Sequence, residues 1–401
     1  MITDVVYMDN NATTRVAPEV VEAMIPYLRD YYGNPSSMYT FGGQVGAAVV
    51  RAREQVAALL GANADEILFT SCGTESDNTA IRSALRVRPG KRHIVTTRVE
   101  HPAVLSLCKN LKKEGYVVTY LSVDSRGWID LDELRHAIRE DTAVVSIMYA
   151  NNETGTIFPI EEAGAIVKER GVLFHVDAVQ ATGKIPLDMS KSHIDMLAVS
   201  GHKIHAPKGV GALYVRRGTP FRAFLIGGHQ EKSRRGGTEN VGSLVGLGAA
   251  AEVAQGNIRH ENTVVRAMRD RLEHGLMSSA PDARLNGHPL HRLPNTANIS
   301  FEYVEGEAIL LLLNQFKICA SSGSACTSGS LEPSHVLRAM GVPYTAAHGS
   351  VRFSLSRYNT DEEVDYVLEK LPPVIRRLRE ISPFGRDGGS RGPQGTKPDY
   401  A

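Results

Sequence analysis

The amino-acid sequence predicts an α/β protein, with a mostly parallel sheet in a large domain and a smaller α+β domain. From about residue 66 to residue 215, short β-branched runs alternate with helical patterns such as residues 74–85 and 160–170. Such alternation is typical of a parallel sheet covered by helices on both faces. The 401 residues are also enough for two or three domains of ~150 residues each. We expect strands at residues 66–70, 93–97, 143–148, 172–176, 196–199 and 211–215.

The pattern changes after about residue 257, where the smaller domain is expected. A charged helical stretch over residues 258–277 leads to a strand at 296–301 and a helix at 306–314. The sequence Thr360–Glu363 is a capping box, which predicts the start of a last helix. Residues 383–401 are rich in Gly and Pro without hydrophobic periodicity, which predicts a disordered tail. We therefore assign residues 16–256 to the large domain, and residues 1–15 and 257–382 to the small domain.

Composition and charge exclude several classes of protein. Lys and Arg together number 45 and Asp and Glu 44, a formal charge of +1, so no basic field indicates nucleic acid or an anionic membrane as a partner. No apolar run approaches the ~20 residues of a membrane-spanning helix. The first residues lack the basic and apolar segments of a secretory signal, so the expected location is cytoplasmic.

Cysteine usage fits the same location. The four cysteines are too sparse for a disulfide framework, and no C-x-x-C pair marks a zinc site. We interpret Cys72, Cys108 and Cys319 as small buried hydrophobes.

The strand at residues 66–70 leads into the first candidate site, residues 71–76. A Gly followed by hydroxyl residues at the start of a helix presents free backbone N–H groups, which suit a phosphate. An ordinary helix N-cap explains the same residues. The chain has no Walker motif, and the loose G-x-G-x-x-A match at residues 246–251 follows no strand, so neither predicts a nucleotide site.

Two further strand ends carry charged residues. Asp177 ends a buried strand, where its carboxylate needs a cationic or hydrogen-bonding partner. The protonated ring nitrogen of pyridoxal phosphate (PLP) is one such partner, and capping of a following helix is the alternative. Lys203 ends the next strand, after Ser200 and His202, where a partly desolvated amine can form a Schiff base with an aldehyde cofactor. Zinc held by His202 and His205 with His175 and Asp177 is a weaker alternative, because it leaves Lys203 unexplained.

The fourth candidate is Cys326, in the Ser/Gly-rich run of residues 321–330. A thiol in a flexible, solvent-reachable loop is suited to nucleophilic attack followed by delivery elsewhere. The alternative is an exposed cysteine without a function.

With these four elements, the chain resembles the cysteine desulfurases of the aminotransferase class-V group, and most closely their nitrogenase-associated (NifS-type) branch. The resemblance runs from residue 9 to about residue 383. It includes, in order, residues 9–14, 33–37, 70–76, 99–104, 150–155, 200–205, 227–231, 321–330, 343–349 and 351–354.

The resemblance implies the aspartate aminotransferase-like fold of PLP-dependent transferases, PLP as cofactor, and a homodimer. Lys203 would hold PLP covalently and move the Cα proton, Asp177 would pair with the ring nitrogen, and Gln180 would contact the ring hydroxyl. His101 would lie over the ring as an acid–base group. The phosphate would be bound by Gly73, Thr74, Ser200, His202 and the partner subunit's Thr238.

The resemblance also implies the reaction. Asn152, which contacts the cofactor as well, and Arg352 would orient L-cysteine, and Cys326 would take its sulfur as a persulfide, leaving L-alanine. The sulfur would pass to an iron–sulfur scaffold protein, for nitrogenase metallocluster assembly, and Cys326 could transiently ligate the shared cluster. Two alternatives remain: another PLP lyase or aminotransferase, such as a selenocysteine lyase, and a docking protein of this fold without activity.

Overall fold

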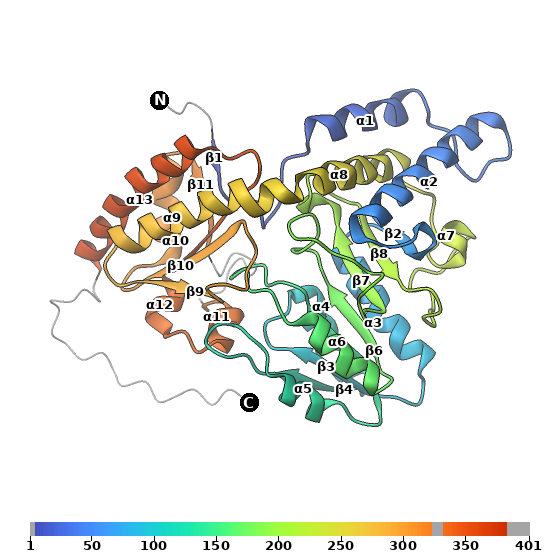
Figure 1. Ribbon diagram of the computed structural model, residues 1–401, viewed down its shortest axis with the longest axis horizontal. Helices are drawn as coiled ribbons and strands as arrows, with labels where there is room; N and C mark the ends of the chain where they lie inside the picture. Colours follow the sequence, from blue (N-terminus) through green and yellow to red (C-terminus); the bar gives the residue numbers. More distant parts are fainter. Residues whose placement is uncertain (1–4, 323–331, 383–401) are drawn as a thin grey trace.

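A seven-stranded sheet and a four-stranded sheet organise the computed structural model, which describes residues 5–322 and 332–382 (Figure 1). The seven strands lie in the order β2-β8-β7-β6-β5-β3-β4. All pairings are parallel except those of β8, which is antiparallel to both β2 and β7. The predicted mostly parallel sheet is therefore confirmed. The strands are β2 (Ile67–Thr70), β3 (His93–Thr97), β4 (Val117–Leu121), β5 (Thr142–Met148), β6 (Leu173–Asp177), β7 (Met196–Ser200) and β8 (Gly211–Val215).

Six of these strands were predicted to within about one residue, and β4 was missed. β4 is an edge strand paired only with β3, and four of its five residues are half-buried or exposed. Its sequence, Val-Val-Thr-Tyr-Leu, nevertheless consists of residues that favour strands, so the sequence does indicate this strand and the expectation that omitted it was wrong.

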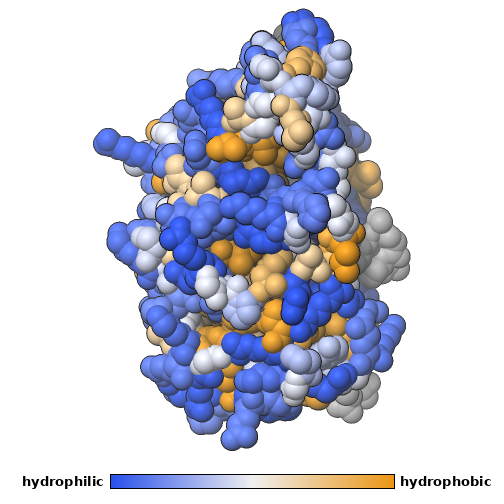
Figure 2. All heavy atoms as spheres, turned by 90° about the vertical axis from the view of Figure 1, so that its right-hand side faces the viewer, coloured by the Kyte–Doolittle hydropathy of each residue, from blue (hydrophilic) through white to orange (hydrophobic). Residues whose placement is uncertain are grey.

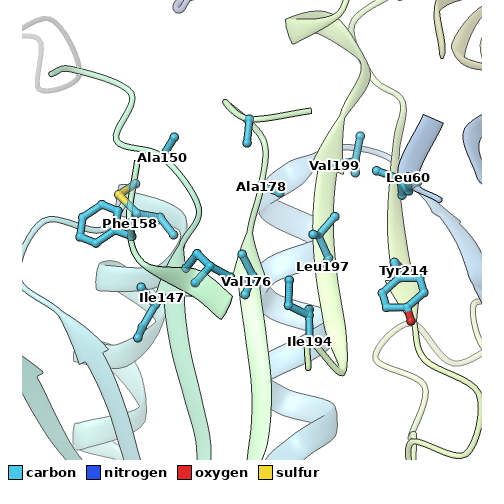
Figure 3. Packing of buried hydrophobic residues seen from close by; sticks show 14 of the residues in the cluster. Leu60, Ile147, Ala150, Phe158, Val176, Ala178, Ile194, Leu197, Val199 and Tyr214 are labelled. Atoms are coloured by element: carbon cyan, nitrogen blue, oxygen red, sulfur yellow. The ribbon is translucent and has the colours of Figure 1, made fainter. Parts of the chain in front are cut away.

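Two layers of helices cover the large sheet. On one face, Leu68, Ile94 and Leu213 pack against α3 (Gly73–Val87) and α4 (Pro102–Lys113). On the other face, Val176, Leu197 and Val199 belong to the core that α2, α6 and α8 cover (Figure 3). Besides α3, α4 and α8, the helices that surround this sheet are α1 (Pro18–Arg29), α2 (Thr40–Leu60), α5 (Leu131–Ala137), α6 (Ile160–Glu169), α7 (Gln230–Ser233) and the 3-10 turns η1 (Ala64–Glu66) and η2 (Gly201–Lys203).

One long helical rod joins the two sheets (Figure 1). It consists of α8 (Val241–His260), a π-helical turn η3 (Glu261–Val265) and α9 (Arg266–Ser279). The sequence predicted only its second part, at residues 258–277. The G-x-G-x-x-A match at residues 246–251 lies inside α8 and forms no nucleotide loop. The predicted domain boundary after residue 256 also falls within α8, and the assignment of residues 16–256, 1–15 and 257–382 stays a prediction.

The smaller sheet is antiparallel, in the order β12-β13-β10-β9. Its own core contains Ile299, Phe353, Leu313 and Leu371. The predicted capping box is present, since the Thr360 hydroxyl accepts from Glu363 N and the Glu363 carboxylate accepts from Thr360 N. The elements are β9 (Ala283–Asn286), β10 (Thr296–Phe301), β12 (Ser321–Ser322), β13 (Ser350–Ser354), α10 (Gly306–Gln315), α11 (His335–Ala339), α12 (Tyr344–His348) and α13 (Asp361–Ile381).

The N-terminal segment packs with the smaller sheet, since Val6 and Met8 lie in the same hydrophobic core. Its strand β1 (Val6–Tyr7) pairs in parallel with β11 (Ile318–Cys319). Within the described ranges, no helix is both long and apolar enough to span a membrane.

Close packing at Gly349, just before β13, gives a stability prediction. A Cβ on Gly349 would lie 2.0 Å from Phe301 O and 2.8 Å from Val304 O, both backbone atoms. We expect Gly349→Ala to lower the free energy of unfolding by about 2 kcal/mol or more, because the backbone of β10 must shift. Denaturant unfolding measures it. Gly256→Ala, in α8 with open space around it, is the control and should be neutral or stabilising by up to ~1 kcal/mol; equal losses in both variants would contradict the packing argument.

Candidate active site

A cavity of about 330 Å³ opens at the carboxyl ends of β2, β5, β6 and β7. The sequence placed the chemistry after these strands, and the structure confirms that their ends meet at one sheet edge. Two predicted residues are not in this lining: Thr238 lies exposed elsewhere, and Cys326 is outside the described residues. The lining includes the predicted residues Gly73, Thr74, His101, Asn152, Asp177, Gln180, Ser200, His202, Lys203 and Arg352.

Lys203 reaches the cavity from η2, directly after β7. Its Nζ donates to the backbone carbonyls of Asn11 and Ala12, both at 2.7 Å. The N-terminal segment therefore forms one wall of the cavity, although no single residue of it was predicted to act there. The amine is thus held by carbonyl oxygens instead of lying in solvent.

Asp177 ends β6 and is buried. Its Oδ1 accepts from Val179 N at 2.9 Å, and the chain then turns without entering a helix. The alternative of a helix-capping Asp therefore does not hold. Desolvation raises the pKa of Asp177, and the nearby His101 and Lys203 oppose this rise. The carboxylate needs a positive partner in the cavity to stay ionised.

Two more buried acids, Asp77 and Glu100, lie close enough to Asp177 to interact with it. Burial raises the pKa of Asp77 well above its ordinary value, with the Asp177 charge adding to the effect. Burial likewise raises the pKa of Glu100 to about 8. Burial therefore favours the protonated form of both groups, whereas at Asp177 the nearby His101 and Lys203 oppose the same effect.

His175 completes this buried layer without carrying a charge. Its Nδ1 lies 2.9 Å from Ser146 Oγ, and its Nε2 lies 3.4 Å from Asp77 Oδ1. Burial lowers the pKa of His175 to about 3. Because the imidazole is neutral at pH 7, its contact with Asp77 is not an ion pair.

The residues predicted to bind phosphate gather at the start of α3. A Cβ on Gly73 would lie 2.8 Å from Val179 Cγ2, so only glycine lets the backbone come this close. Beside it stand Thr74, Ser200 and His202, whose Nδ1 lies 3.1 Å from Thr13 Oγ1. Desolvation, aided by neighbouring lysines, lowers the pKa of His202 to about 4. The imidazole of His202 is therefore neutral at pH 7, and it would offer a phosphate a hydrogen bond instead of a charge. The start of α3 would offer the phosphate backbone N–H groups.

His101 is the N-cap of α4, and its Nδ1 accepts from Ala103 N at 3.2 Å. Desolvation lowers the pKa of His101, so the ring is neutral at pH 7. With Nδ1 accepting, the proton is assigned to Nε2.

Arg352, on β13, brings the smaller sheet to the cavity. Its Nη1 donates to Asn152 O at 3.0 Å, and its Nη2 forms an ion pair with Asp9 at 2.7 Å. Its buried Nε has no hydrogen-bond partner within residues 5–322 and 332–382. A guanidinium oriented in this way is prepared to bind a carboxylate.

Several lining residues were missed by the sequence argument. Asn11, Asp77 and Glu153 are polar and buried here. Cys72, which also lines the cavity, and Cys319 are both half-buried, so their interpretation as buried hydrophobes was wrong; Cys108 is buried as predicted. Two of these residues could have been found from their positions in the sequence: Cys72 comes shortly after β2, and Asn11 lies in the N-terminal motif at residues 9–14.

The zinc alternative finds no support. In the described part of the chain, no group of three or more His, Cys, Asp or Glu side chains could hold a metal ion. His175 faces Ser146 and Asp77, while His205 Nδ1 lies 2.9 Å from Arg15 O.

The arrangement fits PLP on the evidence of its own atoms. A buried carboxylate, a lysine, and a glycine-floored helix start meet in one cavity, and they match the ring nitrogen, the aldehyde and the phosphate of that cofactor.

Comparison with known proteins agrees. The family model for aminotransferase class V matches residues 6–367. A cysteine desulfurase of Nostoc sp. is 66% identical over 386 residues, 96% of each chain. The cysteine desulfurase NifS of Azotobacter vinelandii is 60% identical over 385 residues, also 96% of each chain. A solved NifS-like protein has a TM-score of 0.88 and 42% identity, covering 93% of this chain and all of that one.

The chain belongs to the class-V aminotransferase family, whose members use PLP, and it has the predicted fold of PLP-dependent transferases. Within that family it is a cysteine desulfurase close to NifS.

The buried Glu100 predicts a pH effect on stability. Its pKa is about 8 in the folded protein against an ordinary 4.5. Between these values the native state holds a proton that the unfolded state has released, so the free energy of unfolding falls as the pH rises. In Glu100→Gln this contribution is absent. We expect the variant to gain on the wild type by about 1 kcal/mol per pH unit between pH 5 and pH 8, measured by denaturant unfolding; a constant difference would show that Glu100 is ionised when folded.

Proposed function

We propose that this cysteine desulfurase converts L-cysteine to L-alanine and carries the sulfur as a persulfide on Cys326. An iron–sulfur scaffold protein would accept the sulfur, with nitrogenase metalloclusters as its destination. The observation that carries the proposal is that one cavity unites Lys203, Asp177 and Arg352 with both ends of the segment that contains Cys326.

Cofactor and substrate would be held by separate groups. Bound PLP supplies an electron sink for the substrate Cα. Lys203 would hold the cofactor covalently and, once displaced, move the Cα proton. Asp177 would hold the ring nitrogen in its positive form, because an ionised carboxylate in this buried place is stabilised by a positive partner. Gln180 would contact the ring hydroxyl, and His101 would exchange protons with the thiols.

Arg352 would bind the carboxylate of L-cysteine. Asn152 O and Asp9 fix two corners of its guanidinium, so the group loses little freedom when substrate arrives. Asn152 itself, buried beside it in the lining, would orient the substrate against the cofactor.

The segment with Cys326 is attached to the cavity at both ends. Before it, Ser321 and Ser322 line the cavity. After it, Ser334 Oγ donates to Glu153 Oε2 at 2.5 Å, and His335 Nε2 lies 3.0 Å from Glu100 O. Glu153 also lines the cavity. The described residues before the segment thus line the cavity, and those after it contact Glu153, which lines the cavity, and the backbone of Glu100.

The proposed sulfur transfer balances without another reagent. The Cys326 thiolate attacks the substrate sulfur and forms the S–S bond, while the C–S bond breaks. Its electron pair remains on the former substrate, which gains a proton and leaves as alanine. Splitting the reaction in this way is covalent catalysis. Transient ligation of a cluster by Cys326 stays a prediction.

The exposed apolar side chains support the homodimer. Large hydrophobic groups are concentrated over residues 21–50 and 225–226, including Tyr32 at 78% exposed and Ile226 at 86%. The ion pair Arg53–Glu231 joins α2 to α7, near Thr238 in sequence. Figure 2 faces this side and shows apolar groups among polar ones. A second copy covering this face would bring the partner's Thr238 towards the phosphate site.

The nitrogenase destination is supported by the 60% identity to NifS of Azotobacter vinelandii over nearly the whole chain.

Peptide mass mapping after brief exposure to L-cysteine tests the sulfur carrier. We expect a 32 Da adduct, about the mass of one sulfur, on Cys326 of the wild type together with alanine, and loss of alanine turnover by about 100-fold or more in Cys326→Ala, since the nucleophile is missing. Lys203→Ala is the cofactor control, and should lose the borohydride-reducible link. Full alanine formation in Cys326→Ala would instead indicate a general PLP lyase.

The dimer is tested by matched substitutions at two equally accessible aliphatic positions. Ile226→Asp places a charge in the proposed interface, whereas Leu290→Asp does so elsewhere, at a residue 78% exposed. We expect Ile226→Asp alone to halve the mass measured by light scattering at micromolar concentration and to weaken PLP retention, because a buried charge is unfavourable. A dimer that tolerates Ile226→Asp, or that Leu290→Asp disrupts, would show that another surface is used.

A further inference from the structure

Lys184 is a buried lysine that the proposed reaction does not use. Its side chain is only 6% exposed, and it lies in the turn after β6, beyond Asp177 and Gln180. Nζ donates to Gln180 Oε1 at 2.8 Å and to Asn11 Oδ1 at 3.1 Å. Burying an ammonium is unfavourable unless such bonds compensate it. Both partners of Lys184 line the cavity, so the buried amine contacts the cavity wall.

The first bond fixes the orientation of the Gln180 side-chain amide. While Lys184 is protonated it is a donor only, so the amide then turns its oxygen to Lys184, as the bond of 2.8 Å shows. Its nitrogen then points the other way, where Nε2 donates to Asn11 O at 3.0 Å. The amide has a second N–H, and Gln180 lines the cavity. A flipped amide would present N–H groups to the ammonium instead.

The second bond fixes Asn11, which links several lining residues. Its backbone oxygen accepts from Lys203 Nζ at 2.7 Å as well as from Gln180. Its side-chain Nδ2 donates to Asn152 O at 3.2 Å, the oxygen that also accepts from Arg352. A substitution of Lys184 would therefore alter the positions of Asn11 and Gln180, and through Asn11 the position of the Lys203 amine.

We propose that Lys184 is a positioning residue, which holds the Gln180 amide so that an N–H faces the ring oxygen of the cofactor and holds Asn11 so that its carbonyl receives Lys203. The proposal rests on the assignment of Gln180 to the ring hydroxyl in the proposed function. An N–H donor stabilises the ionised form of that oxygen, whereas an amide oxygen would repel it.

Charged groups on several elements face Lys184. Burial lowers the pKa of Lys184 to about 7, with Lys203 and Arg352 adding to the effect and Glu261 opposing it. The pKa values of His202 and His205 are in turn lowered by Lys184. Replacing Lys184 would remove its part of the lowering at both histidines, and it would do so equally in Lys184→Met and Lys184→Gln, since neither carries a charge.

The test compares Lys184→Met with Lys208→Met, the same change at an exposed lysine a few residues after Lys203. Two quantities are measured: the dissociation constant of PLP from the cofactor-free protein, and the pH midpoint of the visible absorbance of the Lys203-linked cofactor. We expect Lys184→Met to weaken PLP binding about tenfold, the loss typical of a buried hydrogen bond, and to raise the midpoint by about one pH unit. Lys208→Met should stay within about twofold of the wild type.

A double-mutant cycle with Gln180→Ala shows whether Lys184 acts through Gln180. In the Gln180→Ala background, Lys184→Met should raise the midpoint by less than half as much. Lys184→Gln, which restores a neutral donor, serves as a second variant and should lie between the wild type and Lys184→Met, including where Lys184→Met fails to fold.

Unchanged binding and midpoint in Lys184→Met, or fully additive effects in the cycle, would overturn the positioning role. The assignment of Gln180 is tested separately: if Gln180→Ala leaves the midpoint unchanged, that assignment fails whatever Lys184 does.

Discussion

The buried carboxylate of Asp177 is the constraint on which the rest of the cavity depends. Burial raises the pKa of Asp77, Glu100 and Asp177 alike, and it keeps His175 neutral. Of the three acids, only Asp177 has both His101 and Lys203 opposing that rise. A positive group bound in the cavity would therefore stabilise the ionised form of Asp177.

Topology then brings the other groups to that charge. β2, β5, β6 and β7 run in the same direction, because β8 is antiparallel to two of them. The residues after these strands consequently meet at one edge. This is why Gly73 could be placed together with Asp177 and Lys203, which follow it by more than a hundred residues, from the strand pattern. The fold class followed from the same pattern.

What the sequence could not predict depends on contacts between distant segments. Asn11 lies in a motif whose local sequence predicts neither helix nor strand, yet its carbonyl receives Lys203. The pairing of Asp9 with Arg352 and of Ser334 with Glu153 joins residues far apart in the chain. Hydrophobic periodicity predicts helices and strands and their buried faces. It does not predict which polar side chains come into contact after these elements have packed. By contrast, β4 could have been predicted, because Val117–Leu121 is a run of residues that favour strands.

The two sheets contribute different parts of the chemistry, and their junction explains why the cavity needs both. The large sheet carries the groups assigned to the cofactor, whereas β13 carries Arg352 and β12 leads into the segment with Cys326. Ser321 pairs with Arg352 across β12 and β13, so the group that would bind the substrate carboxylate lies beside the strand that precedes residues 323–331. A shift of the smaller sheet would therefore move Arg352 and β12 together, while Gly73, Asp177 and Lys203 stay with the large sheet, which is why the position of one sheet relative to the other sets the geometry of the cavity.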